Sequence, residues 1–566
     1  MLEPVADRQQ AIAARFSPWF PRTLHGAFDE AVAAFSDRPF IITDARSWTY
    51  REVADWSRRV AAGLAQRGIG QGDKVAIILA NYPEFAVLKF AIARLGAVAV
   101  PINMLNRRDE LRYLLEQSDS VALVTMDRFR DNDYLAALDQ IAPNWERNGG
   151  GTALPSLRAV FVLPTGEAPV RKDAALFAEL AETSAVDLPA VTVEPGDVAD
   201  VIYTSGTTGM PKGVMLTHDM LTRTAFGSAY ARAFEDGRRI IFAVPMYHVF
   251  GYSEGLQAAM WVGGAIIPYT RFDAAQMLDG IERHRASDAL LIPTMSLALL
   301  DALPDKRRDL SSLTAMLASG GRAPARLWQA LRDGFGNPEI TTGYGMTEVT
   351  ASGTVTRPDD PPERVLTTNG RMRDVGPAGD PAQGGRLVVY RVVDPDSGAE
   401  LPPGKLGELV AKGIGVTRGY YNKPDATAAT FDSEGWLKTG DLGTVDADGY
   451  VTLLGRCKES YRCGGELVMP SEVEDVLTSR TDILQAHVVP VPDERMGEIG
   501  VAFIVPAPGT NLDPADLQRM VAERVARFKV PRHFLVVGEG DIPVTASGRA
   551  RKFLLSQQAI TTLGLA

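Results

Sequence analysis

The sequence is poor in the features that mark secreted, membrane or metal-binding proteins. It has only two cysteines in 566 residues, Cys457 and Cys463, and their spacing fits neither a zinc site nor a disulfide framework. The most apolar window, residues 258–269, is too short to cross a bilayer. The first twenty residues lack the apolar core of a signal peptide. We therefore expect a cytoplasmic protein without a membrane span.

Positive charge is also in short supply. The chain has 59 Lys and Arg against 70 Asp and Glu, a formal net charge of −11, which argues against binding to nucleic acid or to an anionic membrane. A hydrophobic content of 45% and a charged content of 23% are ordinary for a globular protein. The length exceeds what one hydrophobic core supports, so we expect two or more domains.

Helical and strand patterns alternate along the first part of the chain. Residues 50–67 carry apolar side chains at helical spacing and stop at Gly68, and residues 74–79 form an apolar run typical of a buried strand. A second helix over 84–95 and a second apolar run over 97–101 follow. This alternation with short connections predicts parallel α/β layering.

The pattern changes in the last third of the chain. From about residue 387 short β runs dominate, and beyond Arg456 a compact tail is expected, with helices at 470–477 and 514–528 and strands at 486–491 and 501–505. Residues 144–156 are expected to be an exposed loop because they include three consecutive glycines.

We place a domain boundary at residues 457–459. The expected domains are 1–457 and 458–566. The expected fold class is α/β, with a large N-terminal domain of layered α/β subdomains plus a β-rich subdomain, and a small α+β C-terminal domain.

Residues 203–214 form the most informative segment, Tyr-Thr-Ser-Gly-Thr-Thr-Gly-Met-Pro-Lys-Gly-Val. They follow the mostly apolar run 198–202, so a flexible loop is expected to leave a buried strand there. Glycines let backbone N–H groups approach an anion, hydroxyls donate further hydrogen bonds, and the lysine supplies a mobile positive charge. The pattern indicates a polyphosphate-binding loop more than an exposed linker, although it does not align with a Walker loop.

Three further motifs carry side chains suited to a nucleotide and an acid. Residues 245–251, Pro-Met-Tyr-His-Val-Phe-Gly, place one histidine among apolar residues, which by itself is also typical of a core histidine. In residues 341–348, Thr-Thr-Gly-Tyr-Gly-Met-Thr-Glu, the ring can stack on a purine and the carboxylate can hold Mg²⁺. In residues 436–441, Trp-Leu-Lys-Thr-Gly-Asp, the aspartate can bind a ribose diol or merely cap its own turn.

In this order the motifs resemble those of the adenylate-forming superfamily, which includes acyl-CoA synthetases, adenylation domains of peptide synthetases and beetle luciferases. The resemblance covers almost the whole chain. It includes a Gly-rich turn at residues 319–321, the hinge-like segment 456–459 and the loop 462–466. Residues 407–409 and 419–422 also match, and we expect these two segments to be structural.

The resemblance implies a role for each motif. The implied nucleotide-binding residues are Thr204, Ser205, Gly206, Thr207, Thr208, Gly209, Gly320, Tyr344, Gly345, Asp441 and Arg456. The implied acyl pocket consists of Tyr247, His248, Val249, Phe250, Ser319 and Gly343. The implied catalytic residues are His248, Thr347, Glu348, Lys212 and Arg549, with Glu348 also the metal ligand.

The resemblance further implies that the C-terminal domain is mobile. Lys458 would be its hinge, and Arg462, Gly464 and Gly465 would line a tunnel for the thiol-bearing arm of CoA. In the family, a lysine near the end of the chain enters the site for adenylation. Here that position is Arg549, within Pro-Val-Thr-Ala-Ser-Gly-Arg at residues 543–549.

An arginine is planar and wider than a lysine, so this exchange is not conservative in a tight site. Loss of one well-placed electrostatic contact costs on the order of 10²–10³ in rate. We therefore expect adenylation to be weak or lost and thioesterification to dominate, unless Arg549 partly replaces the lysine or Lys552 reaches the site.

The resemblance implies an AMP-forming acyl-CoA synthetase. Its cofactors would be ATP/AMP, Mg²⁺ and coenzyme A, and its substrate a carboxylic acid or an acyl-adenylate supplied by a separate adenylating enzyme. Three alternatives stay open: an adenylating enzyme that loads a carrier protein, a luciferase-type oxygenase, and a non-catalytic sensor of acyl nucleotides. The identity of the acid and the oligomeric state, a homodimer included, stay open as well.

Overall fold

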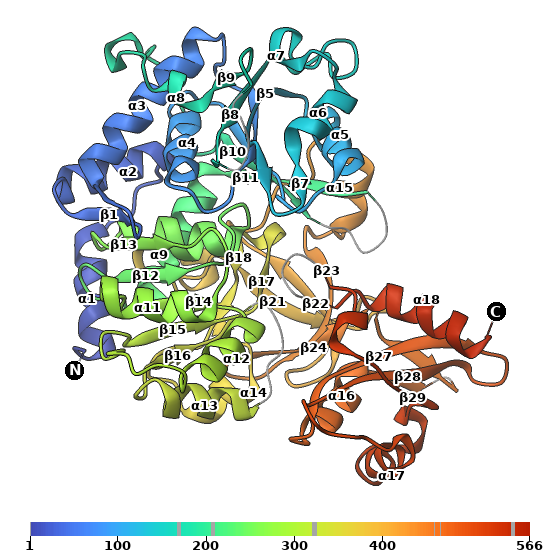
Figure 1. The fold of residues 1–566 in the computed structure, drawn as a ribbon. Helices are drawn as coiled ribbons and strands as arrows, with labels where there is room; N and C mark the ends of the chain where they lie inside the picture. Colours follow the sequence, from blue (N-terminus) through green and yellow to red (C-terminus); the bar gives the residue numbers. More distant parts are fainter. Residues whose placement is uncertain are drawn as a thin grey trace.

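Two mostly parallel sheets form the large part of the molecule, and the C-terminal elements lie to one side of it (Figure 1). The structure is a computed structural model that describes residues 2–166, 171–204, 210–319, 325–457, 459–464, 466–544 and 550–565. The layered α/β class expected from the alternating pattern is confirmed.

Sheet A has the strand order β16-β15-β14-β12-β13-β1-β2, parallel except for β2. Its central strands are buried along their length because helices cover both faces. The strands are β1 (Pro39–Ile42), β2 (Ser47–Thr49), β12 (Arg239–Phe242), β13 (Ala265–Pro268), β14 (Asp288–Leu291), β15 (Ala315–Ala318) and β16 (Glu339–Thr341).

Sheet B has the strand order β11-β10-β4-β3-β5-β8-β9, parallel except that β11 returns antiparallel to β10. The hairpin of β10 and β11 contains the segment predicted to bind phosphate. The strands are β3 (Lys74–Ile78), β4 (Val98–Pro101), β5 (Ser120–Met126), β8 (Ala159–Leu163), β9 (Ala175–Leu176), β10 (Val198–Thr204) and β11 (Lys212–Thr217).

Helices between the strands share one hydrophobic core with both sheets. Phe28 stacks on Phe90 with ring centroids 3.9 Å apart, and the π-helix η2 packs so closely on sheet A that a Cβ on Gly255 would lie 3.0 Å from Phe242. These helices are α2 (Leu24–Phe35), α3 (Tyr50–Gln66), α4 (Pro83–Arg94), α9 (His218–Ala231) and η2 (Phe250–Gln257).

Further helices, turns and short strands complete the large part, and some of these helices share a second hydrophobic cluster with sheet A. The helices are α1 (Val5–Phe16), α5 (Arg108–Gln117), α6 (Tyr134–Ile141), α7 (Trp145–Asn148), α8 (Phe177–Leu180), α10 (Ala258–Met260), α11 (Ala274–His284), α12 (Pro293–Ala302), α13 (Ala325–Gly334), α14 (Pro362–Thr367) and α15 (Pro424–Thr430). The 3₁₀ turns are η1 (Ala185–Asp187), η3 (Thr347–Val349), η4 (Gly376–Ala378) and η5 (Pro381–Gln383). The short strands are β6 (Arg128–Phe129), β7 (Asn132–Asp133), β17 (Gly345–Met346), β18 (Ala351–Ser352), β19 (Thr354–Val355) and β20 (Arg371–Met372).

The β-rich part and the C-terminal part follow in that order. The β-rich part is the antiparallel sheet β21-β22-β23-β24, made of β21 (Val389–Val393), β22 (Gly407–Lys412), β23 (Leu437–Val445) and β24 (Val451–Arg456). The C-terminal part has its own hydrophobic core, separate from that of the sheets. Its elements are β25 (Tyr461–Cys463), β26 (Glu466–Val468), α16 (Pro470–Thr478), β27 (Ile483–Asp493), β28 (Gly497–Pro506), α17 (Pro514–Arg524), η6 (Arg527–Lys529), β29 (His533–Val536), η7 (Glu539–Asp541) and α18 (Lys552–Leu563).

Two expectations about these elements need correction. The segment 144–156 is exposed over much of its length, but it contains the short helix α7 and is anchored by Trp145, which is 1% exposed and donates a hydrogen bond to Asp139. Gly149 and Gly150 pack against backbone, and a Cβ on Gly150 would lie 2.0 Å from the Leu154 carbonyl. The helix expected over 514–528 ends at Arg524 because the next residue, the β-branched Val525, is extended.

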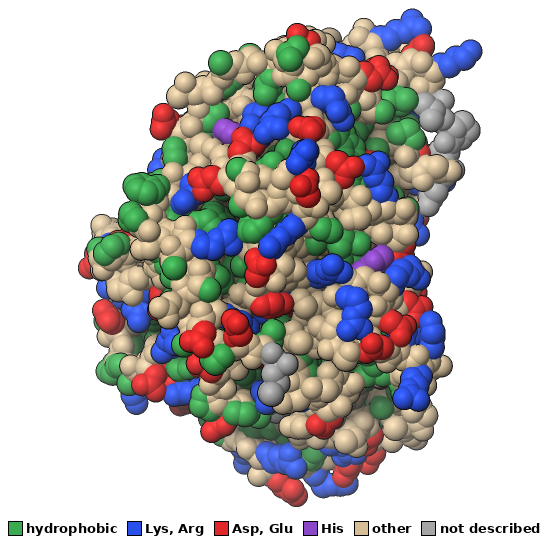
Figure 2. Space-filling view, turned by 90° about the vertical axis from the view of Figure 1, so that its left-hand side faces the viewer, with side chains coloured by type: hydrophobic (Ala, Val, Ile, Leu, Met, Phe, Trp, Pro, Cys, Tyr) green, Lys and Arg blue, Asp and Glu red, His purple; other side chains and the backbone are tan. Residues whose placement is uncertain are grey.

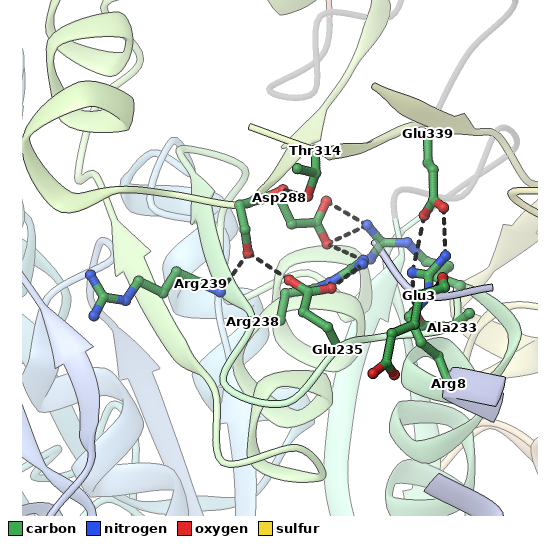
Figure 3. A network of polar contacts seen from close by, with 11 residues as sticks. Glu3, Arg8, Ala233, Glu235, Arg238, Arg239, Asp288, Thr314 and Glu339 are labelled. Carbon is green, nitrogen blue, oxygen red and sulfur yellow. Dashed lines mark hydrogen bonds and ion pairs between the residues drawn. The ribbon is translucent and has the colours of Figure 1, made fainter. Parts of the chain in front are cut away.

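Buried ion pairs fasten the amino-terminal edge of sheet A (Figure 3). Asp288 is the first residue of β14. Its Oδ1 accepts a hydrogen bond from Arg232 Nη2 at 2.6 Å, and its Oδ2 lies 3.4 Å from Arg238 Nη1. Beside them Arg8 of α1 pairs with Glu339, the first residue of β16, at 2.5 Å. The charges thus lie at the edge of the sheet opposite the carboxyl ends of its strands.

One face of the molecule carries charges of both signs without large separation. Figure 2 shows blue and red side chains interspersed with small apolar areas over one face. In the part of the chain that the structure describes, no helix combines the length and the apolar character that a membrane crossing requires.

Candidate active site

Two turns assigned to the acyl pocket meet at the carboxyl edge of sheet A. Ser319 follows β15 and Gly343 follows β16, and the Ser319 hydroxyl donates a hydrogen bond to the Gly343 carbonyl at 2.7 Å. A Cβ on Gly343 would lie 2.4 Å from the Thr354 carbonyl, so glycine is required there. Ligands of α/β sheets bind beyond this edge, because the loops that follow parallel strands gather there.

The predicted adenine and ribose residues form one cluster. The Tyr344 hydroxyl donates a hydrogen bond to Asp441 Oδ2 at 2.7 Å, and Arg456 Nε lies 3.0 Å from Asp441 Oδ1. Burial, together with the neighbouring Asp441 carboxylate, raises the pKa of Tyr344 well above its ordinary value. The tyrosine therefore stays a hydrogen-bond donor at every physiological pH, and the cluster joins sheet A to the β-rich sheet.

Tyr420 links two predicted phosphate-side residues, Glu348 and Lys212. Its hydroxyl donates to Glu348 Oε1 at 3.0 Å, and Lys212 Nζ lies 4.8 Å from the centre of its ring. Burial raises the pKa of Glu348. We expected the segment of Tyr420 to be structural, but it places an aromatic ring between a cation and a carboxylate.

The backbone that follows Glu348 adopts a conformation rare for these residue types. Thr350 has φ 58° and Ala351 has φ 82°, in the left-handed region that a β-branched residue seldom occupies. The Thr350 hydroxyl donates to the Gly415 carbonyl at 2.8 Å, and Thr417 N donates to the Glu348 carbonyl at 2.8 Å. Such strain persists where surrounding contacts enforce it, as at many functional sites.

His248 lies half-buried in the segment that connects β12 to η2. Burial lowers its pKa to about 4, so the imidazole is neutral at pH 7. Its ring is 4.8 Å from that of Tyr247, and the buried Tyr247 and Val249 flank it in sequence. The predicted pocket residues of this segment, with Phe250 at the start of η2, therefore lie together.

Asn81, three residues after β3, holds the His248 segment in place, a role that the sequence patterns did not predict. Its Oδ1 accepts from Met246 N at 2.8 Å, and its Nδ2 donates to the carbonyls of Val244 at 3.0 Å and Tyr269 at 3.1 Å. It is 3% exposed. The only signal in the sequence was an amide directly after an apolar run and before Pro83.

The predicted CoA-tunnel residues lie in the C-terminal sheet. Arg462 Nη2 lies 3.1 Å from Asp396 Oδ2, in the turn between β21 and β22. Gly464 has φ 62° in the turn between β25 and β26. The structure thus sets this turn beside the β-rich sheet, and its proposed contact with CoA stays a prediction.

The remaining predicted residues divide into two groups. Thr204 and Thr347 are described, at the end of β10 and the start of η3, and a Cβ on Gly345 would lie 1.7 Å from the Ala351 carbonyl. The predicted residues outside the described part of the chain are Ser205, Gly206, Thr207, Thr208, Gly209, Gly320, Lys458, Gly465 and Arg549.

The arrangement suits binding of a nucleotide with its phosphates near Lys212. One buried carboxylate, Glu348, faces that side. Within the described residues no group of three His, Cys, Asp or Glu side chains is arranged to hold a metal ion. A cation at Glu348 would therefore take most of its ligands from substrate phosphates and water, as Mg²⁺ commonly does.

Two family matches cover most of the chain. Residues 28–421 match the AMP-binding enzyme family, and residues 472–549 match the AMP-binding enzyme C-terminal domain. The two matches follow the same order as the large and the small parts of the fold.

Several known proteins are similar to this chain over nearly their full length. The putative acyl-CoA synthetase YngI of Bacillus subtilis is 32% identical over 96% of this chain and 98% of that protein. A 3-[(3aS,4S,7aS)-7a-methyl-1,5-dioxo-octahydro-1H-inden-4-yl]propanoyl:CoA ligase of Mycobacterium tuberculosis is 34% identical over 94% of this chain and 98% of that protein.

Solved structures share the fold as well. ATP-bound MatB from Rhodopseudomonas palustris aligns with a TM-score of 0.81 and 27% identity, covering 94% of this chain and 99% of that one. The o-succinylbenzoate CoA synthetase of Bacillus subtilis, in complex with its acyl-adenylate intermediate, aligns with a TM-score of 0.77 and 26% identity, covering 94% and 98%. The chain therefore belongs to the AMP-binding enzyme family, and it is a member of the acyl-CoA ligase type with both of the family's domains.

Proposed function

We propose that the protein is an AMP-forming acid–thiol ligase that converts a carboxylic acid into its CoA thioester through an acyl-adenylate. The observation that carries the proposal is the convergence of Tyr344, Asp441, Glu348 and Lys212 around one edge of sheet A. The CoA ligases among the relatives support CoA as the acceptor more than a carrier protein.

The first step joins the acid to AMP. A carboxylate oxygen attacks the α-phosphorus of ATP, an O–P bond forms, and the bond to the β-phosphate breaks with release of pyrophosphate. Lys212 offsets charge that develops on the leaving group, and Thr347 contacts the α-phosphate. Mg²⁺ on Glu348, where the single carboxylate fits its usual binding by substrate phosphates, would supply further charge neutralisation.

The second step transfers the acyl group to sulfur. The CoA thiolate attacks the acyl carbon, a C–S bond forms, and the bond to AMP breaks, while the thiol proton passes to solvent. Free thiols ionise near pH ~8.5, so positioning of the thiolate matters more than a dedicated base. In this proposal neutral His248 lies beside the acyl group without adding a charge.

We further propose that the small domain begins at residues 457–459 and alternates between the two steps about Lys458. Support comes from its separate hydrophobic core, which starts at Tyr461. In this proposal Arg549 approaches the nucleotide for adenylation, and the turn of Gly464 approaches it for thioesterification.

Arg549 leads us to propose that adenylation is the weak half-reaction. A lysine ammonium is a compact charge, whereas the guanidinium is planar and wider, so it fits less well between a carboxylate and an α-phosphate. The protein would then act best on acyl-adenylates, including those made by another enzyme.

The experiment follows both half-reactions with the full-length protein. Pyrophosphate release is measured with ATP, Mg²⁺ and a panel of acids, and thioester formation is measured by mass spectrometry with synthetic acyl-adenylates and CoA. We expect Arg549→Lys to raise pyrophosphate release by about 10²-fold and to leave thioester formation from acyl-adenylate unchanged. Fast pyrophosphate release by the wild-type protein would refute the weak-adenylation proposal, and absence of thioester from every substrate would refute the ligase.

A further inference from the structure

One face of helix α5 holds both ends of the β10–β11 hairpin. Tyr203, at the end of β10, donates its hydroxyl hydrogen to Gln117 Oε1. Tyr113 donates its hydroxyl hydrogen to the carbonyl of Pro211, just before β11, at 3.0 Å. Tyr113 and Gln117 are four residues apart on α5, so their side chains project from the same face of the helix.

The other end of the Gln117 amide reaches the β-rich part. Its Nε2 donates to the carbonyl of Tyr421 at 2.9 Å, and Tyr421 N donates to the carbonyl of Gly213 in β11 at 2.8 Å. The Tyr421 hydroxyl in turn donates to Asp119, two residues beyond α5, at 3.1 Å. The half-buried side chain of Gln117 thus accepts a hydrogen bond from β10 and donates one to Tyr421, which itself bonds to β11.

These contacts fix the two hairpin residues predicted to meet the phosphates. Thr204 pairs with Lys212 in the β10–β11 ladder, next to the pair of Tyr203 and Gly213. Lys212 also lies over the ring of Tyr420, the residue before Tyr421. A shift of the hairpin away from α5 would therefore move Thr204 and Lys212 together.

We propose that Gln117 and Tyr113 are positioning residues that hold Thr204 and Lys212 at the place of the β- and γ-phosphates of ATP. The proposal deepens the proposed function, on which it rests for the nature of the nucleotide. If it holds, substitutions on α5 weaken the binding of ATP and leave the binding of AMP unchanged, because AMP lacks the phosphates that the hairpin is proposed to bind.

The test measures binding of ATP and of AMP by calorimetry to the full-length protein. Gln117→Leu removes both hydrogen bonds of the amide, and Tyr113→Phe removes only the bond to Pro211. A tenfold change in affinity corresponds to 1.4 kcal/mol. We expect Gln117→Leu to weaken ATP binding about tenfold and Tyr113→Phe about threefold, with AMP binding changed less than twofold.

A matched control is Gln140→Leu, which removes an exposed glutamine that bonds to Arg108 at the other end of α5. We expect it to bind both nucleotides like the wild-type protein. Tyr203→Phe keeps the ring and loses the donation to Gln117, so it tests the same contact if Gln117→Leu does not fold.

Equal weakening of ATP and AMP binding would overturn the proposal, since it would indicate a general structural role. Unchanged ATP affinity in both α5 variants would overturn it as well. Failure of the ligase activity is a separate result, because nucleotide binding is measured without turnover. If the wild-type protein bound ATP no more tightly than AMP, the assignment of the hairpin to the β- and γ-phosphates would itself be overturned.

Discussion

The hydroxyl of Tyr344 donates a hydrogen bond to the carboxylate of Asp441 at 2.7 Å, joining residues that lie 97 positions apart. Both groups are buried. The bond ties the turn after β16 to β23, so the two walls of the predicted nucleoside site are held at a fixed separation.

Tyr344→Phe removes this hydrogen bond and leaves the ring in place. Because hydrogen bonds to charged groups contribute about 1.5–3 kcal/mol, we expect the free energy of unfolding to fall by about that amount and AMP affinity to fall. Urea unfolding and AMP calorimetry measure the two effects.

Tyr390→Phe is the control for that change. The Tyr390 ring lies 5.5 Å from that of Tyr344, but its buried hydroxyl makes no hydrogen bond with any residue that the structure describes. Removing it should leave the stability unchanged or raise it. If Tyr390→Phe lowered the free energy of unfolding as much as Tyr344→Phe, the hydrogen bond from Tyr344 to Asp441 would not explain the effect of Tyr344→Phe.

Asn81→Leu should loosen the predicted acyl pocket without affecting nucleotide binding. The change leaves Met246 N and the carbonyls of Val244 and Tyr269 without their partner, so we expect a loss of about 2–4 kcal/mol in stability. At a temperature where the variant is folded, KM for the acid should rise about tenfold while the Kd of AMP stays unchanged. Parallel losses for acid and AMP would contradict a specific role in holding the His248 segment.

His248 should make the protein sensitive to mild acid. Its folded-state pKa of about 4 lies below the ordinary value of 6.5, so the unfolded chain binds a proton first as pH falls. The resulting stability is fully present above pH ~6.5 and is lost as pH falls towards 4. His248→Gln does not titrate, so its unfolding free energy should decline less steeply between these limits. Equal slopes for the two proteins, measured by urea unfolding, would contradict the prediction.

Glu348→Gln should stabilise the protein at neutral pH. Burial raises the folded-state pKa of Glu348, so the native state favours the protonated form and loses stability as pH rises from the unfolded-state pKa through the folded one. The variant should therefore unfold at higher urea than the wild type at pH 7, with the difference vanishing below pH ~4. It should also need more Mg²⁺ for pyrophosphate release. A Glu348→Gln variant less stable than the wild type at pH 7 would contradict the predicted gain in stability.

Much of the fold follows from local patterns in the chain. Apolar spacing predicts α3, β3, α4 and β4 to within about a residue or two, because each element buries one periodic face. The order of the motifs likewise predicts that Tyr344, Glu348 and Asp441 belong to one site, although their roles stay predictions.

The residues that hold the site were not predictable in the same way. Asn81 bonds to residues more than 160 positions away, and Gln117 to Tyr203, 86 positions away. A single amide at the end of a strand or helix has no periodicity and no characteristic spacing. Only the folded chain brings its partners into reach.

The ion pairs around Asp288 have a consequence for how substrate range can change in this family member. They stiffen one edge of sheet A, while the turns of His248, Ser319 and Gly343 leave the other edge. Effects of substitutions add independently when sites share no contacts. Variation in the turns predicted to face the acid should therefore draw little on the stability held at the far edge, so we expect the scaffold to keep its fold when these turns change.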